Sequence, residues 1–263
     1  MSRWVPAQDR GQMLDLAMDL NARGVIPSLN YLGEKTADVK TVKANIEEYI
    51  RLAQEGCERR VRFALSVKPS QLGVLVSSTL LRQNVTTIVE VIRGTGVWLF
   101  LDAEGEITNE NSWQSLRELI RAEPQIVPTV QVSSAKERRR LPEILSLGRR
   151  VRLCKGAYQT AAFRVEDLKG VVNEMLKLAP ASNFVLATNS PSIVRLVSAG
   201  SQGGFPEIET LQGNHKRAEE AAKLSGLGVR RYIPYGDGWL QYCRRRDAWF
   251  RKNVVSIRNG TFR

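Results

Sequence analysis

Eight short runs of apolar and β-branched residues recur along this chain, and longer stretches of mixed polarity separate them. The runs cover residues 25–29, 61–67, 97–101, 126–132, 151–154, 184–188, 207–211 and 229–234. Parallel strands need a long return connection, which is usually a helix, so strands that alternate with helices predict a parallel sheet. Eight such units predict an α/β fold with a closed (β/α)8 barrel of the TIM type.

The stretches between these runs carry the spacing of amphipathic helices. Residues 39–54, for example, place Val42, Ile46 and Tyr49 on one face. The other predicted helices cover 13–23, 78–93, 111–122, 136–147, 165–178, 190–198, 215–224 and 237–252. Asn111 and Ser190 are predicted N-caps, and Pro191 suits a first helical position. The rival fold, an open doubly wound sheet, carries a GxGxxG turn after an early strand, and this sequence has none.

The length fits one barrel, because the chain has 263 residues and a (β/α)8 barrel takes about 250. No repeat, low-complexity tract or linker divides it, so we expect a single domain over residues 1–263. Three widely spaced cysteines indicate reduced thiols rather than a disulfide framework. His215 is the one histidine, so we expect neither a metal site nor a Ser-His-Asp triad.

The first residues lack the apolar segment of a signal peptide, and no apolar stretch approaches the length of a membrane span. We therefore expect a cytoplasmic protein. The net charge is +12, and the basic runs lie scattered at 136–140, 149–150, 230–231 and 244–246, with no accompanying motif for stacking on bases. We expect no nucleic-acid partner, and a peripheral contact with an anionic inner-membrane surface stays open.

Charged residues stand at the ends of several predicted strands, where the chemistry of (β/α)8 barrels is found. Lys68, Asp102, Arg152 and Lys155 follow or interrupt apolar runs, where an unpaired charge would be costly. Lys68 and Asp102, on adjacent strands, are predicted to form an ion pair. The excess of cations favours an anionic ligand such as a carboxylate or a phosphate. The alternative is a structural ion pair that lines the barrel mouth.

Three arginines, Arg244, Arg245 and Arg246, stand in the last predicted helix. Successive helical residues point about 100° apart, so at most two of the three converge on one point. Two guanidinium groups can hold one carboxylate through paired hydrogen bonds. A solvated basic helix face is the alternative.

Six motifs, in order over residues 25–252, resemble those of the proline dehydrogenase family, in particular its short monofunctional bacterial-type members. They are Leu29–Glu34 (LNYLGE), Ser66–Gly73 (SVKPSQLG), Asp102–Glu104 (DAE), Val151–Tyr158 (VRLCKGAY), Leu186–Thr188 (LAT), and Tyr232–Gly236 (YIPYG) followed by Tyr242-x-x-Arg245-Arg246. The resemblance implies a distorted (β/α)8 barrel with non-covalent FAD. It also implies oxidation of L-proline to Δ1-pyrroline-5-carboxylate, by hydride transfer from proline Cδ to flavin N5. A quinone would accept the electrons, and pyrroline-5-carboxylate dehydrogenase stays open as a partner.

The resemblance also assigns roles to individual residues. The residues that would bind the substrate are Lys68, Tyr232, Arg245 and Arg246. The catalytic pair would be Asp102, which holds Lys68 in place, and Arg152, which stabilises the reduced flavin. The residues that would hold FAD are Ala103, Gln131, Lys155, Gly156, Ala157, Thr188 and Asn189. The last helix, predicted over 237–252, would close the active site.

Three positions depart from the family pattern. Ser133 stands where an aromatic residue follows the fourth strand, Asn189 where a histidine follows the sixth, and Glu209 where the seventh strand carries glutamine. All three fall in the cofactor and seventh-strand region, while the residues expected to bind the substrate are retained. Two alternatives therefore stay open. One is a catalytically impaired barrel that acts as a non-catalytic binding protein, and the other is a dehydrogenase of hydroxyproline or another cyclic imino acid.

Overall fold

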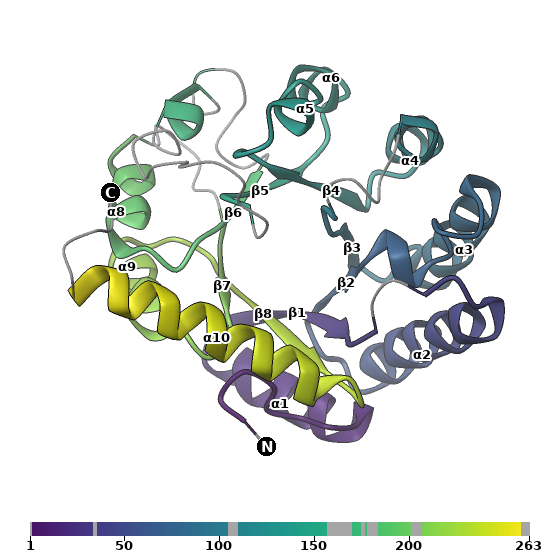
Figure 1. Cartoon of the computed structure of the whole chain (residues 1–263), viewed down its shortest axis with the longest axis horizontal. Helices are drawn as coiled ribbons and strands as arrows, with labels where there is room; N and C mark the ends of the chain where they lie inside the picture. The colour runs from purple at the N-terminus through teal and green to yellow at the C-terminus, as the bar shows by residue number, and fades with distance from the viewer. Residues whose placement is uncertain are drawn as a thin grey trace.

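Eight parallel strands close into a barrel, as the alternating sequence pattern predicts (Figure 1). The computed structural model describes residues 2–33, 36–104, 110–156, 170–174, 177, 184–200 and 207–258, without the side chains of residues 110, 200 and 249–258. The strands are β1 (Val25–Tyr31), β2 (Ala64–Val67), β3 (Trp98–Leu101), β4 (Ile126–Gln131), β5 (Val151–Cys154), β6 (Phe184–Ala187), β7 (Glu207–Leu211) and β8 (Val229–Tyr235). Each strand pairs with the next along the chain, and β8 pairs with β1 to close the ring.

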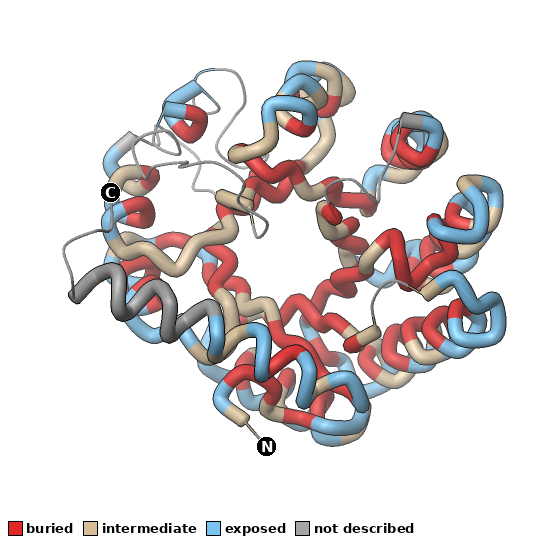
Figure 2. Tube along the Cα trace, viewed as in Figure 1, coloured by how far each residue is buried: buried red, intermediate tan, exposed pale blue. Residues whose placement is uncertain are grey.

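Helices surround the barrel and connect successive strands (Figure 1). They are α1 (Arg10–Ala22), α2 (Val39–Glu58), α3 (Ser78–Ile92), α4 (Glu110–Ala122), α5 (Ala135–Arg138), α6 (Leu141–Ser146), α8 (Pro191–Gly200), α9 (Lys216–Leu224) and α10 (Trp239–Arg258). A short 3-10 turn, η1 (Pro69–Gln71), follows β2. Figure 2 shows that the strands are largely buried and that the exposed parts of the helices face outward. The helices therefore shield the sheet from water on all the sides described.

Short polar side chains set the starts of three helices. Asp9, Asp38 and Ser77 are the N-caps of α1, α2 and α3, and each accepts a hydrogen bond from a backbone N–H of the first turn. Such a cap typically contributes about 1 kcal/mol. Pro191 is the first residue of α8, as predicted, because its missing N–H has no partner to lose there.

Alternate residues of each strand point into the barrel or out toward the helices. The outward residues, such as Leu65 and Leu153, join the main hydrophobic core. Inward apolar residues form a separate buried layer that consists of Ala64, Phe100, Val127 and Val185. The barrel interior is therefore a packed core rather than a pore, and it supports the polar residues at the strand ends.

The prediction of one helix over 136–147 is wrong, because the chain forms two short helices there, α5 and α6. Pro142 lies in the first turn of α6. Proline has no N–H, and its ring clashes with the carbonyl group four residues earlier, so one continuous helix cannot pass through this position.

Other predicted boundaries shift by a few residues. Asn111 is not the N-cap of α4, because this helix already includes Glu110. The second strand begins at Ala64 rather than at 61. The helix predicted over 165–178 lies outside the described residues except for 170–174 and 177. The last helix, α10, starts at Trp239 and continues past the predicted end at 252.

None of the three cysteines, Cys57, Cys154 and Cys243, is part of a disulfide, as the sequence predicts. Among the residues described, no helix combines the length and the apolar character needed to cross a membrane.

Candidate active site at the carboxyl ends of the strands

Lys68, the first residue after β2, is the centre of a hydrogen-bonded cluster. Its ammonium group donates to Asn30 Oδ1 at 3.0 Å, to Asp102 Oδ2 at 3.2 Å and to the Tyr232 hydroxyl at 2.9 Å. An ammonium group has three N–H donors, and these three bonds use as many. The ion pair predicted between Lys68 and Asp102 is therefore confirmed.

Asp102, directly after β3, accepts hydrogen bonds from four side chains. Tyr232 donates to Oδ2 at 3.0 Å, Ser66 donates to Oδ1 at 2.6 Å, and Arg152 pairs with the same Oδ1. Burial by itself would raise the pKa of Asp102, but Lys68, Arg152 and the hydrogen bond from Ser66 lower it from 3.8 to about 2. The carboxylate therefore stays ionised at neutral pH.

Arg152, on β5, points into the barrel with a side chain that is 4% exposed. Its Nε donates to Thr129 Oγ1 at 2.8 Å, and Nη1 donates to Ser66 Oγ at 3.1 Å and to Glu209 Oε2 at 3.0 Å. Burial disfavours the charged form, yet the carboxylates of Glu209 and Asp102 outweigh it and raise the pKa of Arg152. The guanidinium group is therefore a fixed, charged feature of the barrel interior.

Glu209, on β7, neutralises part of this charge. Its side chain is 3% exposed and accepts a second hydrogen bond, from the Ser28 hydroxyl at 2.7 Å. Two cations, Lys68 and Arg152, thus face two carboxylates, Asp102 and Glu209. The prediction of an excess of cations at the strand ends is wrong for this cluster. The sequence pattern did not show that Glu209 reaches Arg152.

The end of β1 is held by a second set of buried groups. Asn30 Nδ2 donates to the carbonyl group of Ser66 at 2.8 Å. The Tyr49 hydroxyl donates to Gln71 Oε1 at 3.0 Å, and Gln71 Nε2 donates to the carbonyl group of Tyr31 at 2.6 Å. These bonds connect α2 and η1 to β1 and β2. They therefore fix the backbone around Lys68, which lies between β2 and η1.

Three residues expected to hold FAD lie together at the ends of β3, β4 and β5. Gln131 Nε2 donates to the carbonyl group of Ala103 at 3.1 Å. Gly156 has a φ of +122°, which suits glycine, and a Cβ built on it would overlap Ser133 Oγ and lie 3.1 Å from Gln131 Oε1. A side chain therefore has no room at position 156, because Ser133 and Gln131 fill the space that it would take.

The remaining expected cofactor residues follow β5 and β6. Asn189 Oδ1 accepts from the backbone N–H of Leu211 at 2.9 Å, and Thr188 Oγ1 accepts from the backbone N–H of Ser190 at 3.1 Å. Lys155 is half-buried directly after β5. Ala157 lies outside the described residues. The donors and acceptors of Gln131, Thr188 and Asn189 thus come from the same end of the barrel as the Lys68 cluster.

α10 carries the two arginines expected to bind a carboxylate, and it crosses one side of the barrel in Figure 1. Arg245 is exposed, and Arg246 is half-buried with its guanidinium group 5.1 Å from the ring centroid of Tyr242. The Tyr242 hydroxyl is buried and has no hydrogen-bond partner among the residues described. Burial, then Asp102 and then Tyr242 raise the pKa of Tyr232 well above its usual range. Tyr242, which Arg246 contacts, is thus close enough to Tyr232 to influence it electrostatically.

No family model matches the chain, but two curated proteins resemble it over most of its length. Proline dehydrogenase 1 of Bacillus subtilis (strain 168) is 26% identical to it, with 92% of this chain and 83% of the relative covered. Proline dehydrogenase 2 of the same strain is 20% identical, with 97% and 88% covered. The resemblance to proline dehydrogenases is confirmed.

Solved structures show the same fold. Proline utilization A (PutA) from Bdellovibrio bacteriovorus, inactivated by N-propargylglycine, matches with a TM-score of 0.76 at 14% identity over 89% of this chain. A PutA variant from Bradyrhizobium japonicum matches with a TM-score of 0.71 at 18% identity over 92%. This chain spans 31% and 30% of those two longer proteins. At these identities the likeness concerns the barrel alone.

Sequence reasoning gave no role to several residues of the site, among them Ser66, Ser28 and Tyr242. Ser66 bridges Asp102 and Arg152, Ser28 supports Glu209, and Tyr242 presents its unpartnered hydroxyl. Small hydroxyl residues inside an apolar strand give little signal on their own. Tyr242 could have been found, because it belongs to the Tyr-x-x-Arg-Arg motif and lies one helical turn before Arg246.

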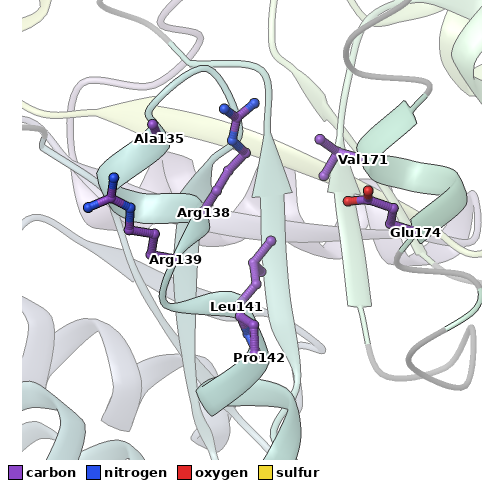
Figure 3. Close-up of a pocket in the computed structure, with 7 residues that line it drawn as sticks. All are labelled: Ala135, Arg138, Arg139, Leu141, Pro142, Val171 and Glu174. Carbon is purple, nitrogen blue, oxygen red and sulfur yellow. The ribbon is translucent and has the colours of Figure 1, made fainter.

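A pocket of about 340 Å³ lies outside the barrel, between the α5–α6 segment and residues 170–174 (Figure 3). Arg138 lines it on one side and Glu174 on the other. None of the residues that line it belongs to the Lys68 cluster, so it does not enter the function proposed below.

Proposed function

We propose that this protein is a proline dehydrogenase that uses FAD to oxidise L-proline to Δ1-pyrroline-5-carboxylate and passes the electrons to a quinone. The observation that carries the proposal is the hydrogen-bonded set of Lys68, Asp102, Tyr232 and Arg152 at the carboxyl ends of the strands. It stands at the position where (β/α)8 barrels carry their chemistry, in a chain that resembles proline dehydrogenases over most of its length.

The substrate carboxylate would be bound by Arg245 and Arg246, whose guanidinium groups offer paired donors. Lys68 would contribute its positive charge rather than a hydrogen bond, because its ammonium group already donates to Asn30, Asp102 and Tyr232. The buried Tyr242 hydroxyl, with no partner among the described side chains, would donate to the substrate as well. A neutral imino acid ring would then pack against Tyr232.

The residues present fit a flavin. Gly156 is half-buried beside Gln131 and Ser133, and the ends of β3 to β6 offer a carboxamide, an ammonium group and a hydroxyl group. Ala103, Gln131, Lys155, Gly156, Ala157, Thr188 and Asn189 would hold the cofactor. FAD, when bound, supplies an acceptor for the hydride that leaves proline Cδ. Arg152 would place positive charge near the flavin ring.

Proton transfer from the substrate amine has no evident base in the cluster. The pKa of Asp102 is lowered to about 2, so this carboxylate is a poor proton acceptor at neutral pH. The pKa of Tyr232 is raised well above its usual range, so this hydroxyl stays protonated. We infer that the amine loses its proton to solvent, while the cluster holds the substrate in place.

The test is a visible absorption spectrum of the purified protein with added FAD, recorded before and after anaerobic L-proline. A flavin band that proline bleaches supports the proposal. A flavin band that hydroxyproline bleaches and proline does not would change the substrate. If FAD does not bind, the non-catalytic alternative replaces the proposal, and the ion pair of Glu209 with Arg152 is the feature that favours it.

The electron acceptor and the partners are tested separately. Quinone reduction after proline addition would support the acceptor. Product channelling to pyrroline-5-carboxylate dehydrogenase would support that enzyme as a partner. The net charge of +12 motivates co-sedimentation with anionic and neutral vesicles, and equal recovery with both would argue against membrane contact.

A further inference from the structure

Residues 2–7, which we call the N-terminal arm, pack against α10. Trp4 is 2% exposed and forms a buried cluster with Val5, Leu32, Tyr242 and Cys243. Its indole Nε1 donates to Asp247 Oδ1 at 2.8 Å. Ser2 Oγ and Cys243 Sγ are hydrogen-bonded at 2.8 Å. The arm thus packs against Tyr242 and is hydrogen-bonded to Cys243 and Asp247, which are four residues apart on α10.

The arm is itself anchored to the barrel. Ala7 forms a β-bridge with Tyr235, the last residue of β8. Gln212 Nε2, after β7, donates to the carbonyl group of Arg3 at 3.1 Å. Gly213 has a φ of +90°, and a Cβ built on it would overlap the Trp4 ring. The arm therefore fills the space between the β7 loop and α10.

Helix geometry relates these contacts to the arginines. Residues four apart lie on one face of a helix, so Cys243 and Asp247 form one stripe of α10. Tyr242 and Arg246 form the adjacent stripe, about 100° away. A helix moves as a stiff unit over two turns. The contacts of the arm with Cys243 and Asp247 therefore also set the position of Tyr242 and Arg246.

We propose that Trp4 is a positioning residue, which holds α10 so that Arg245 and Arg246 meet the substrate carboxylate. This inference rests on the proposed function. Tryptophan suits the task, because its ring fills the apolar cluster while its N–H reaches the Asp247 carboxylate. The other arm contact with Asp247, from Arg3 at 3.7 Å, joins side chains that are 48% and 44% exposed, so it contributes little.

The test is Trp4→Phe, which keeps an aromatic ring and removes the indole donor. Hydrogen exchange of the backbone amides of residues 240–248 should become about tenfold faster, because a hydrogen bond to a charged group is lost. Exchange in β8 should not change. The KM for L-proline should rise about tenfold while kcat is retained, because the residues around the reacting atoms are untouched.

Matched variants separate positioning from general destabilisation. Trp113→Phe makes the same change in α4, where the tryptophan is also buried, and should alter neither readout. Asp247→Ala should reproduce Trp4→Phe, and Asp247→Asn should be milder, because the amide oxygen can still accept from the indole.

Two results would overturn the inference. Unchanged exchange in α10 of Trp4→Phe would show that the arm does not hold the helix. Faster exchange with an unchanged KM would show that the hold does not matter for substrate binding. If the wild-type protein does not oxidise proline, the proposed function fails together with the substrate half of this inference. The exchange measurement then tests by itself whether the N-terminal arm holds α10.

Discussion

Asp102→Asn is the change that tests the cluster most directly, because it removes one negative charge and keeps the shape of the side chain. The carboxylate is 12% exposed and pairs with both Lys68 and Arg152. Lowering the pKa of Asp102 from 3.8 to about 2 corresponds to about 2.5 kcal/mol, since one pKa unit is about 1.36 kcal/mol. Removing one partner of a buried ion pair costs about 3–5 kcal/mol. The free energy of unfolding at neutral pH should therefore fall by about 2.5–5 kcal/mol.

Urea denaturation of wild type and Asp102→Asn measures this difference. A depressed carboxyl pKa gives stability that is complete above the unfolded value of 3.8 and is lost as the pH falls toward about 2. The gap between the two proteins should therefore close over this range. Asp15→Asn is the control, because Asp15 pairs with Arg59 at the surface and is 73% exposed. A loss under about 0.5 kcal/mol at neutral pH, or a gap that does not depend on pH, would refute the reasoning.

Three further changes probe the substrate, the flavin and the backbone. Arg245→Lys should raise the KM for L-proline about 10–100-fold, because lysine cannot offer paired donors; Arg244→Lys, also exposed, should not, and equal values would remove Arg245 from carboxylate binding. Glu209→Gln should make the reduction potential of bound FAD more positive in dye equilibration, because Arg152 loses one of its two carboxylates; an unchanged potential would place this pair away from the flavin. Gly156→Ala should cost about 1–3 kcal/mol in thermal unfolding and more than Gly148→Ala, whose added Cβ meets nothing within 4 Å; equal losses would mean that Ser133 moves aside easily.

The strands could be predicted because each is a short apolar run next to a helical stretch, and all eight were found within a few residues. Lys68 and Asp102 could be predicted as a pair because they end adjacent strands. The split between α5 and α6 was also readable from Pro142, but the apolar periodicity on both sides of it favoured one helix.

Contacts across the barrel could not be predicted from single strands. Arg152 on β5 meets Glu209 on β7, and Arg152 also meets Asp102 after β3, so its two carboxylate partners come from strands that are not its neighbours. Their side chains meet only because the sheet closes and all three point inward. Trp4 gave no signal either, because one aromatic residue in an irregular segment has no periodicity.

The three departures from the family pattern are each satisfied locally. Glu209 is held by Arg152 and Ser28, Asn189 accepts from the backbone of Leu211, and Ser133 lies against Gly156. None leaves a buried charge unpaired, so the substitutions do not by themselves weaken the barrel.

The three substitutions should instead affect one step of the reaction, which is the reduction of the flavin. Arg152 shares its charge with two carboxylates, so it has less to offer a reduced flavin than an arginine with a single carboxylate partner. Lys68, Tyr232 and the arginines of α10 are unaffected, because Glu209 contacts none of them in the part of the chain described. Substrate affinity and flavin reduction should therefore separate in this protein, with proline bound normally and the flavin reduced slowly. A barrel that had lost its function altogether would not be expected to retain normal proline binding.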